Sequence, residues 1–259
     1  LNCMNRLDEG IGMVLEVLDE MELRENTFII YISDHGADFP RGKTSCYEGG
    51  VKVPMIVSFP GVFPEGKVES SLVSTLDILP SFLKAAGMAM PSELPGRPLQ
   101  DLLNPKTTWR KYIHTFNTGS SAHLLNLAFG IRDERYRLIY HAIPGTNPAP
   151  ISRYNNSRVP ESLWLSGYVN PPEFELFDLD NDPYEFTNLA ENPKYAEIRA
   201  RLFQAMQDFR KEINDPFLDP ANVTFYIEEM RNPARHPQKG TDESWGHLEK
   251  FYHPENATR

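Results

Sequence analysis

The stretch Thr27–Gly61, TFIIYISDHGADFPRGKTSCYEGGVKVPMIVSFPG, determines how the rest of the chain is interpreted. It opens with an unbroken run of β-branched and aromatic residues, Thr27–Ile32, which is typical of a strand buried on both faces in a parallel sheet. The run stops at the polar segment Ser33–Gly36, and a second apolar strand, Val53–Phe59, follows a glycine-rich loop. Because ligands gather at the carboxyl ends of strands in open α/β sheets, we expect a functional site at this strand end.

Composition bounds the class of protein. The chain has 259 residues, enough for one large domain or two smaller ones, and its 40% apolar and 24% charged residues are typical of a globular protein. A formal net charge of −10 argues against a nucleic-acid partner, which would need a basic face. No apolar run is long enough for a membrane span. Cys3 and Cys46 show neither metal-ligand spacing nor a disulfide framework.

The chain is expected to open with an amphipathic helix over about residues 5–23. Its apolar face consists of Met4, Leu7, Ile11, Val14, Leu15 and Leu18. A helix followed by a buried strand is the repeat of a βαβ sheet. Because the sequence starts with Leu1 inside or just before this helix, we expect the chain to be part of a longer protein.

A further helix is predicted from Leu72 to Ala86, ending at Gly87. Pro80 lies within this pattern and predicts a kink or a late helix start. Its buried face is expected to carry Leu76, Leu79, Phe82 and Leu83. The Pro-rich connection that follows predicts a domain boundary near Pro105, giving domains over residues 1–105 and 106–259.

Beyond that boundary the pattern changes to short strands. Runs at 112–116, 124–132, 136–141 and 174–179 predict an antiparallel sheet, and 195–213 predicts an amphipathic helix. The helix face is expected to carry Ile198, Leu202, Ala205, Met206 and Phe209. The stretch 144–172 is expected to be a long functional or mobile loop, and the polar tail from residue 233 to wrap or fray.

Three residues of the central stretch are candidates for chemistry. Asp34, at a strand end, is a residue type that binds a hard cation or orients a nucleophile, and His35 can be a ligand or a polar partner. The plainer alternative is a carboxylate capping a turn beside a solvated histidine. Lys43, in the glycine-rich loop, can place a compact positive charge on an oxyanion, although an isolated lysine is more often only solvated.

Other polar residues are weaker candidates. Cys46 has no adjacent base and is interpreted as a structural thiol. His114 and His123 can line a pocket, but a hydrogen-bonded or exposed histidine is the default. The acidic segment Asp178–Glu185 suggests calcium superficially, yet it lacks the glycine and terminal glutamate of an EF-hand loop, so a structural turn is favoured.

Taken together, these residues resemble the sulfatase family. The central motif is Ser33–Gly36, followed by Lys43, Tyr47–Pro54 and Pro60-Gly61. Later family-like segments are Leu76-Asp77-Ile78-Leu79-Pro80, Gly96-Arg97-Pro98-Leu99, Glu175–Leu179, Asp182–Glu185 and Asn188-Leu189-Ala190. The motifs follow the family order over residues 1 to about 215, which makes the resemblance far more specific than any one of them.

The resemblance implies an α/β fold. The chain would be the later part of an alkaline-phosphatase-like sulfatase domain, followed by a small α+β C-terminal subdomain with a four-stranded antiparallel sheet. It implies one calcium ion (Ca²⁺) with Asp34 and His35 as ligands, although many members have Asn at the second position. It implies that Lys43 contacts the sulfate oxygens and that Asp34 helps to orient a hydrated formylglycine nucleophile.

The chain also departs from the family pattern. The Cys/Ser-x-Pro-x-Arg segment that yields formylglycine, and the early paired-aspartate metal motif, do not occur here. The sequence is therefore interpreted as the C-terminal half of a sulfatase, inactive alone, with the missing N-terminal half as its partner. Two other readings stay open: a phosphate or phosphonate ester hydrolase of the same fold, which two zinc ions would favour, and an inactive glycan-binding relative.

A closer resemblance points to the substrate. The segments Phe39–Thr44 and Asn214–Phe217 resemble the sulfamidase branch of the family, which cleaves the sulfamate of N-sulfoglucosamine in heparan chains, a glycosaminoglycan. Lys43 and His35 differ from that branch, which has Arg and Asn there. A sulfated saccharide is the expected substrate, and His123, in the loop 119–123, is a candidate substrate contact.

Compartment and assembly are weakly indicated. Three Asn-x-Ser/Thr acceptor patterns, at Asn155, Asn222 and Asn256, are compatible with a secreted, periplasmic or lysosomal protein. A homodimer is kept open as the assembly.

Overall fold

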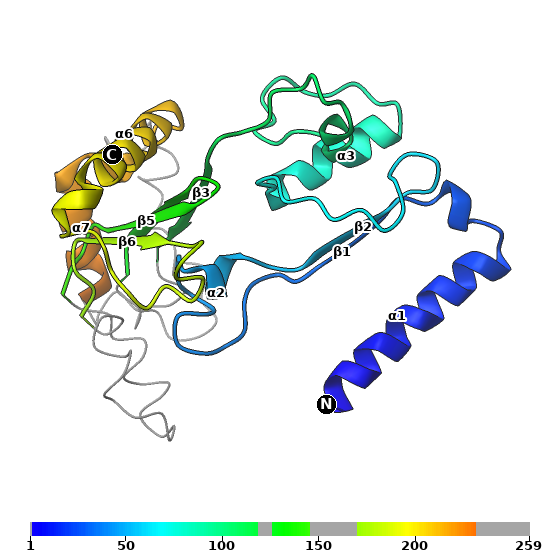
Figure 1. The fold of residues 1–259 in the computed structure, drawn as a ribbon, viewed down its shortest axis with the longest axis horizontal. Coiled ribbons are helices and arrows are strands. Elements are labelled where there is room, and N and C mark those ends of the chain that lie inside the picture. The colour runs from blue at the N-terminus through cyan, green and yellow to red at the C-terminus, as the bar shows by residue number, and fades with distance from the viewer. Residues whose placement is uncertain (1, 119–125, 146–169, 232–259) are drawn as a thin grey trace. The chain divides into compact units, whose positions relative to one another are not determined.

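The computed structural model describes residues 2–118, 126–145 and 170–231 (Figure 1). The chain divides into two compact units: residues 1–34 with 53–113, and residues 35–52 with 114–259. The segment 35–52 thus packs with residues far later in the chain. The domains expected at 1–105 and 106–259 stay a prediction.

The first unit begins with helix α1 (Asn2–Glu20), followed by a short 3-10 turn, Arg24–Asn26. The helix was expected at 5–23 and begins and ends slightly earlier. Its apolar face is present but none of its residues is buried, and Met4 is 64% exposed. The expected helix is therefore found, and within the described residues its apolar face is at most half-buried.

Strands β1 (Ile29–Ile32) and β2 (Met55–Ser58) form a two-stranded sheet (Figure 1). They pair antiparallel, with Ile29 opposite Ser58. The parallel arrangement expected for β1 is wrong within the described residues, and β1 is half-buried. A parallel partner needs a long crossover, usually through a helix, whereas the chain between these two strands holds only the one-turn helix α2 (Glu48–Val51).

A cluster of aromatic rings packs beside the two-stranded sheet of this unit. Phe28 stacks on Phe59, with ring centroids 5.1 Å apart, and meets the edge of Phe82 at 5.0 Å. Phe63 lies 5.7 Å from the same ring. Offset and edge-to-face contacts of this kind stabilise by about 0.5–1.5 kcal/mol each beyond the area they bury.

Helix α3 (Ile78–Ala85) follows a 3-10 turn, Thr75–Asp77, so Pro80 lies in its first turn and the late helix start is confirmed. Gly87, with φ +64°, ends the helix, and the N–H of Met88 donates to the carbonyl of Leu83. Most of the expected buried face is wrong: Leu76, Leu79 and Phe82 are 40–55% exposed, and only Leu83 is half-buried. The buried side carries Asp77, Pro80 and Ser81 instead.

Asp77 explains this reversal. Its fully buried carboxylate accepts the backbone N–H groups of Ser74 and Arg97, each at 2.8 Å, and both Nη atoms of Arg110. Ser81 then accepts the N–H of Leu99 at 2.8 Å, at the start of the 3-10 helix Leu99–Leu103. A polar network therefore forms the inside of this segment, while Leu76 and Leu79 are exposed.

The second unit is built on a four-stranded sheet in the order β3 (Ile113–Asn117), β4 (Ala128–Arg132), β5 (Tyr136–His141) and β6 (Phe174–Asp178). The pairs β4–β5 and β5–β6 are antiparallel, as expected. Sheet residues that are at most 1% exposed include Ile131, Leu138, Ile139, Leu176 and Phe177.

Helix α6 (Ala196–Glu212), after the 3-10 turn Pro193–Tyr195, packs against β4 and β5 (Figure 1). Leu202 and Met206 are almost fully buried, as the periodicity predicts. A second 3-10 turn, Pro216–Leu218, leads into α7 (Pro220–Arg231). Within the described parts of the chain, no helix has the length and hydropathy of a membrane span. Most of the loop 144–172 and the tail from 233 lie outside the described residues.

Candidate functional site

Residues 35–52, here called the Lys43 loop, close on themselves. The N–H of Gly36 donates to the carbonyl of Gly50 at 2.9 Å, and the N–H of Lys43 donates to Ala37 at the same distance. A Cβ on Gly36 would lie 1.7 Å from the carbonyl oxygen of Gly49. The glycines of this loop therefore serve close backbone approach, and the turn they make cannot accept a side chain at Gly36.

Lys43 lies between two residues with left-handed backbones. Arg41 has φ +62° and Thr44 has φ +67°. Non-glycine residues in this region cost free energy and persist where surrounding contacts hold them, commonly at functional sites. The contacts are present here: Asn117 Nδ2 donates to the carbonyl of Thr44, and Arg41 Nη2 donates to the carbonyl of Glu185. Lys43 itself is half-buried.

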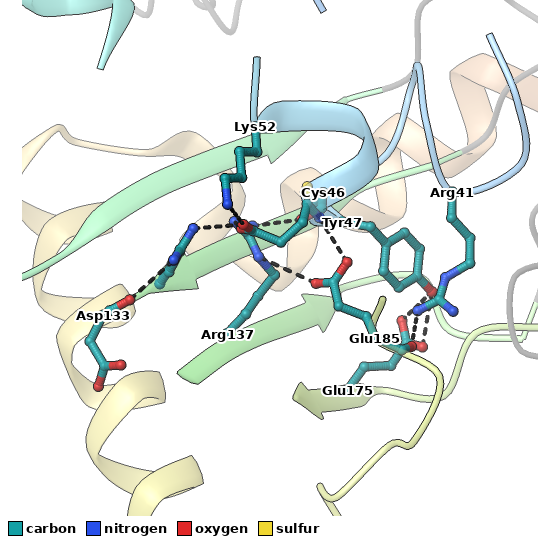
Figure 2. A network of polar contacts seen from close by, with 10 residues as sticks. Arg41, Cys46, Tyr47, Lys52, Asp133, Arg137, Glu175 and Glu185 are labelled. Atoms are coloured by element: carbon teal, nitrogen blue, oxygen red, sulfur yellow. Dashed lines mark hydrogen bonds and ion pairs between the residues drawn. The ribbon is translucent and has the colours of Figure 1, made fainter. Parts of the chain in front are cut away.

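Tyr47 fastens the loop to the sheet of the second unit (Figure 2). Its hydroxyl donates to the carboxylate of Glu175 on β6, with distances of 2.7 and 2.9 Å to the two oxygens. The same carboxylate lies 2.8 Å from Nε2 of His141 on β5. Tyr47 is 3% exposed, and burial, assisted by the nearby Glu175 charge, raises the pKa of its hydroxyl well above the usual value.

A buried ion cluster fastens the next residue of the loop. The carboxylate of Glu48 accepts Nη1 of Arg132 at 2.6 Å and Nη2 of Arg137. Arg137, on β5, also donates through Nη1 to the carbonyl of Cys46 at 2.7 Å. Glu185 joins from the turn after β6: its Oε2 accepts the backbone N–H of Glu48 at 2.8 Å, and its Oε1 lies 3.4 Å from Nε of Arg137. Figure 2 shows Arg137 and Glu185 side by side within this cluster.

Burial dominates the electrostatics of this cluster. The side chains of Arg137 and Glu185 are each 3% exposed. Burial raises the pKa of Glu185 to about 7, against the opposing effect of the Arg137 charge. A carboxyl group inside the fold therefore titrates near neutral pH, where a solvated glutamate is fully ionised.

The predicted metal ligands lie at the start of the loop. Asp34 is exposed, and Ser33 donates to its Oδ1 at 3.5 Å. Nδ1 of half-buried His35 lies 2.8 Å from the carbonyl of Gly36. Because a carbonyl only accepts, Nδ1 carries the proton, which leaves the lone pair of the neutral ring on Nε2. This is how metal-binding histidines are commonly oriented.

The side chains at this position supply only part of a metal site. Within the described residues no three His, Cys, Asp or Glu side chains gather as a metal site. The Asp34 carboxylate is the hard oxygen donor that Ca²⁺ prefers, but Ca²⁺ takes six to eight oxygens, and an imidazole is not among its usual ligands. These two residues therefore fit part of a metal site at most.

Other sequence candidates have structural surroundings. His114 stacks on Phe209 at 3.9 Å, and burial lowers its pKa to about 4, which keeps it neutral. Burial raises the pKa of Cys46 to about 11, in keeping with a structural thiol. His123 lies outside the described residues. In the acidic segment, Asp178 pairs with Arg135 and accepts from Asn181, as a structural turn would.

The ion cluster itself was not predicted. Its members come from segments far apart in the sequence, namely Glu48, Arg132, Arg137 and Glu185. One signal was present: Arg137 and Glu175 are charged residues inside runs that predict buried strands. Charged residues are almost never fully buried unless they are paired, so such positions indicate a partner elsewhere in the chain.

The comparisons with known proteins bear on this geometry. The sequence model of the sulfatase family matches residues 1–88. An ulvan-active sulfatase of Formosa agariphila is 31% identical over 212 residues, covering 78% of this chain and 41% of that protein. The human N-sulphoglucosamine sulphohydrolase is 28% identical, covering 90% of this chain and 51% of the enzyme. Over most of its length the chain is similar to sulfatases.

A similar solved structure indicates the fold family of this chain. A protein in complex with its substrate D-glucosamine-2-N,6-O-disulfate superimposes with a TM-score of 0.64 at 26% identity, covering 80% of this chain and 39% of that protein. The fold is alkaline-phosphatase-like, as the sequence motifs imply. The chain spans about two fifths to one half of the curated relatives described above.

Proposed function

We propose that the whole protein to which this sulfatase-like chain belongs hydrolyses a sulfate ester or sulfamate on a sulfated sugar. The observation that carries the proposal is the held, strained loop around Lys43. A preorganised cation costs no reorganisation when charge develops on sulfuryl oxygens, which is where such an enzyme needs it. The similarity to proteins named for ulvan and N-sulphoglucosamine supports a sulfated saccharide as substrate.

Each candidate residue has a role in this proposal. The Lys43 ammonium contacts the sulfate oxygens. Asp34 and His35 contribute to a metal site, with Ca²⁺ as the proposed ion, and Asp34 also orients the nucleophile. The nucleophile is a formylglycine formed in a segment outside this sequence, so this chain alone is proposed to be inactive. A bound metal would stabilise negative charge on the sulfuryl group. His123 remains a proposed substrate contact.

The decisive experiment compares two lysines of the same loop in the full-length enzyme. Lys43→Ala is expected to lower kcat/KM on N-sulfoglucosamine or a 6-O-sulfated glucosamine by about 10²–10³, the scale of one lost preorganised donor. Lys52→Ala is the control, since Lys52 is 69% exposed and only 3.9 Å from Glu48. Its rate should change by less than about threefold, because exposed ion pairs contribute little. An unchanged rate for Lys43→Ala would remove this residue from the site.

The metal proposal is tested by calcium binding in equilibrium dialysis. Asp34→Ala in the full-length protein should abolish binding of Ca²⁺ alone, while Asp38→Ala, an exposed carboxylate of the same loop, should retain it. Retained binding by Asp34→Ala would contradict its role as a ligand.

Two alternatives predict different results. A phosphate or phosphonate ester hydrolase of this fold would prefer phosphate esters and bind two zinc ions, and a fold alone does not decide between such chemistries. An inactive glycan-binding relative would bind sulfated sugars without turnover. Peptide mapping of the full-length protein for a formylglycine-containing peptide separates the inactive relative from the leading proposal. The relative rates on sulfate and phosphate esters separate the phosphate or phosphonate ester hydrolase.

Compartment and assembly remain proposals: a secreted, periplasmic or lysosomal protein, with a homodimer open. Among the acceptor patterns only Asn222 lies in the described residues. It lies in α7, and its Nδ2 donates to the carbonyl of Pro216 at 2.8 Å. A glycan on that nitrogen would compete with this bond, so Asn222 adds no support for a glycosylated protein.

A further inference from the structure

The ion cluster beneath the Lys43 loop is unused by the proposed reaction, yet it touches the loop on both sides of Lys43. Glu185 accepts a hydrogen bond from the Arg41 side chain through its carbonyl and one from the N–H of Glu48 through Oε2. We propose that Glu185 is a positioning residue whose protonation state sets how firmly the Lys43 loop is held.

The conformation of Glu185 directs its carboxylate into the fold. Its φ of +60° places it in the left-handed region, between two exposed aromatic neighbours, Tyr184 at 75% and Phe186 at 66% exposure. Its own side chain turns inward and is 3% exposed. A strained backbone that buries a carboxylate between two exposed rings requires contacts that hold it in place, and Arg41, Arg137 and the Glu48 N–H are those contacts.

Arg137 transmits the state of Glu185 to the loop. Its Nη1 donates to the carbonyl of Cys46 and its Nη2 to Glu48, while Nε faces Oε1 of Glu185 at 3.4 Å. The charged groups that face Glu185 are therefore Arg137 from β5, and Glu48 and Arg41 from the loop itself. Two carboxylates share one buried guanidinium, so a proton on Glu185 relieves the repulsion between the two carboxylates and the cost of keeping a second charge desolvated.

The sign of the effect follows from linkage. Opening the loop would let water reach Glu185, and its pKa would return from about 7 towards the model-compound value of 4.5. The closed loop therefore binds this proton more tightly than the open loop does, and closure is favoured at low pH. The opening equilibrium is expected to rise with pH between these two values, by up to roughly 300-fold if opening fully exposes the carboxyl.

This inference concerns closure of the loop and is testable without turnover. Only its value for catalysis, the placement of the Lys43 ammonium, rests on the proposed function. A failure of the proposed sulfatase reaction would leave the closure result standing, and the reverse also holds.

The experiment is hydrogen exchange of the full chain, with protection factors for amides 36–48 compared at about pH 5 and about pH 8. In the natural sequence, loop protection should fall by at least tenfold at the higher pH, with the β4–β6 amides as internal reference. In Glu185→Gln the ratio of the loop protection factors at the two pH values should approach one. Its amide can accept from Glu48 or face Arg137 with its oxygen, but not both, so protection should also be lower at about pH 5.

Asp178→Asn is the matched control. Asp178 forms a two-contact ion pair with Arg135 at 2.7 and 2.8 Å, and its carboxylate also accepts from Asn181. It should keep the natural pH ratio of loop protection. An equal loss of that ratio in this control, or equal loop protection of the natural chain at both pH values, overturns the proposal.

Arg41→Ala keeps the test decisive if Glu185→Gln does not fold. This change removes the contact with the Glu185 carbonyl and the cation–π contact with Tyr47 at 4.1 Å, while the Glu185 carboxyl keeps its own partners. Loop protection should fall at both pH values with the pH ratio retained. Unchanged protection in Arg41→Ala would contradict the proposal that Glu185 holds the Lys43 loop.

Discussion

Arg110 holds the carboxylate of Asp77 with both terminal nitrogens, and the Asp77 side chain is completely buried in the first unit. The carboxylate also accepts two backbone N–H groups, from Ser74 and Arg97. This aspartate lies in a family-like motif, and its buried contacts organise the chain around α3.

Asp77→Asn is expected to lower the free energy of unfolding of the first unit by about 3–5 kcal/mol, because the Arg110 charge stays in place without its partner. Denaturant titration measures the change. Asp101→Asn is the control, since the Asp101 side chain is 32% exposed and pairs with exposed Lys84. Asp101→Asn should lower the free energy of unfolding by less than about 1 kcal/mol. Similar losses in the two variants would contradict the structural role of Asp77.

Gly96→Ala is expected to prevent normal packing of the same segment. A Cβ there would lie 1.9 Å from the carbonyl oxygen of Leu76, and neither backbone can move away without breaking the Asp77 network. Thermal unfolding should show a large loss of Tm. Gly10→Ala in α1 is the counterpart, with no atom within 4 Å of the new Cβ. It should stabilise slightly, by about 0.5–1 kcal/mol, through helix propensity.

Tyr47→Phe tests the attachment of the Lys43 loop to β6. The variant leaves the buried Glu175 carboxylate with His141 but without the hydroxyl donor, which should cost about 1–3 kcal/mol in urea unfolding of the second unit. Tyr184→Phe, at a 75% exposed position, should be nearly neutral. A neutral Tyr47→Phe would mean that the ring alone anchors the loop.

The global stability of the second unit should depend on Glu185 with a definite sign. Its folded-state pKa, about 7, lies above the ordinary glutamate value of 4.5, so the stabilising contribution is complete below about pH 4.5 and is lost as pH rises through about 7. Compared with Glu185→Gln, the natural chain should lose roughly 3 kcal/mol of its free energy of unfolding between about pH 4.5 and pH 7. Urea unfolding at a series of pH values gives the difference.

Asp178 should show the opposite sign. The hydrogen bonds from Arg135 lower the pKa of Asp178 to about 2, from 3.8. Its contribution is therefore present above about pH 4 and is lost as pH falls towards 2. If Asp178→Asn changed stability most between pH 5 and 7, the assignment of the two titrations would be wrong.

Local patterns in the sequence predicted much of the second unit. Strands β4, β5 and β6 and helix α6 were found close to their expected residues, because alternation and helical periodicity report burial of one face by one core. The burial of Leu202 and Met206 follows directly from that periodicity.

Patterns failed where polar groups decide the packing. The α3 face was assigned to leucines, yet the fold buries Asp77 and Ser81 because their partners, Arg97, Leu99 and Arg110, arrive later in the chain. The antiparallel pairing of β1 also depends on where the following loop packs. Predicting the Glu48–Arg137–Glu185 cluster would have required knowing three distant segments at once.

The second unit is built from two separate stretches of the chain, and this limits how these proteins can recombine. A chimera that takes only residues 114–259 from another relative would pair a foreign sheet with the resident segment 35–52. Tyr47 and Glu48 would then meet whatever side chains replaced Glu175 and Arg137, and any mismatch would leave buried charges unpaired. Exchange between family members should therefore succeed when both blocks travel together, which ties the inheritance of the C-terminal sheet to that of the Lys43 loop.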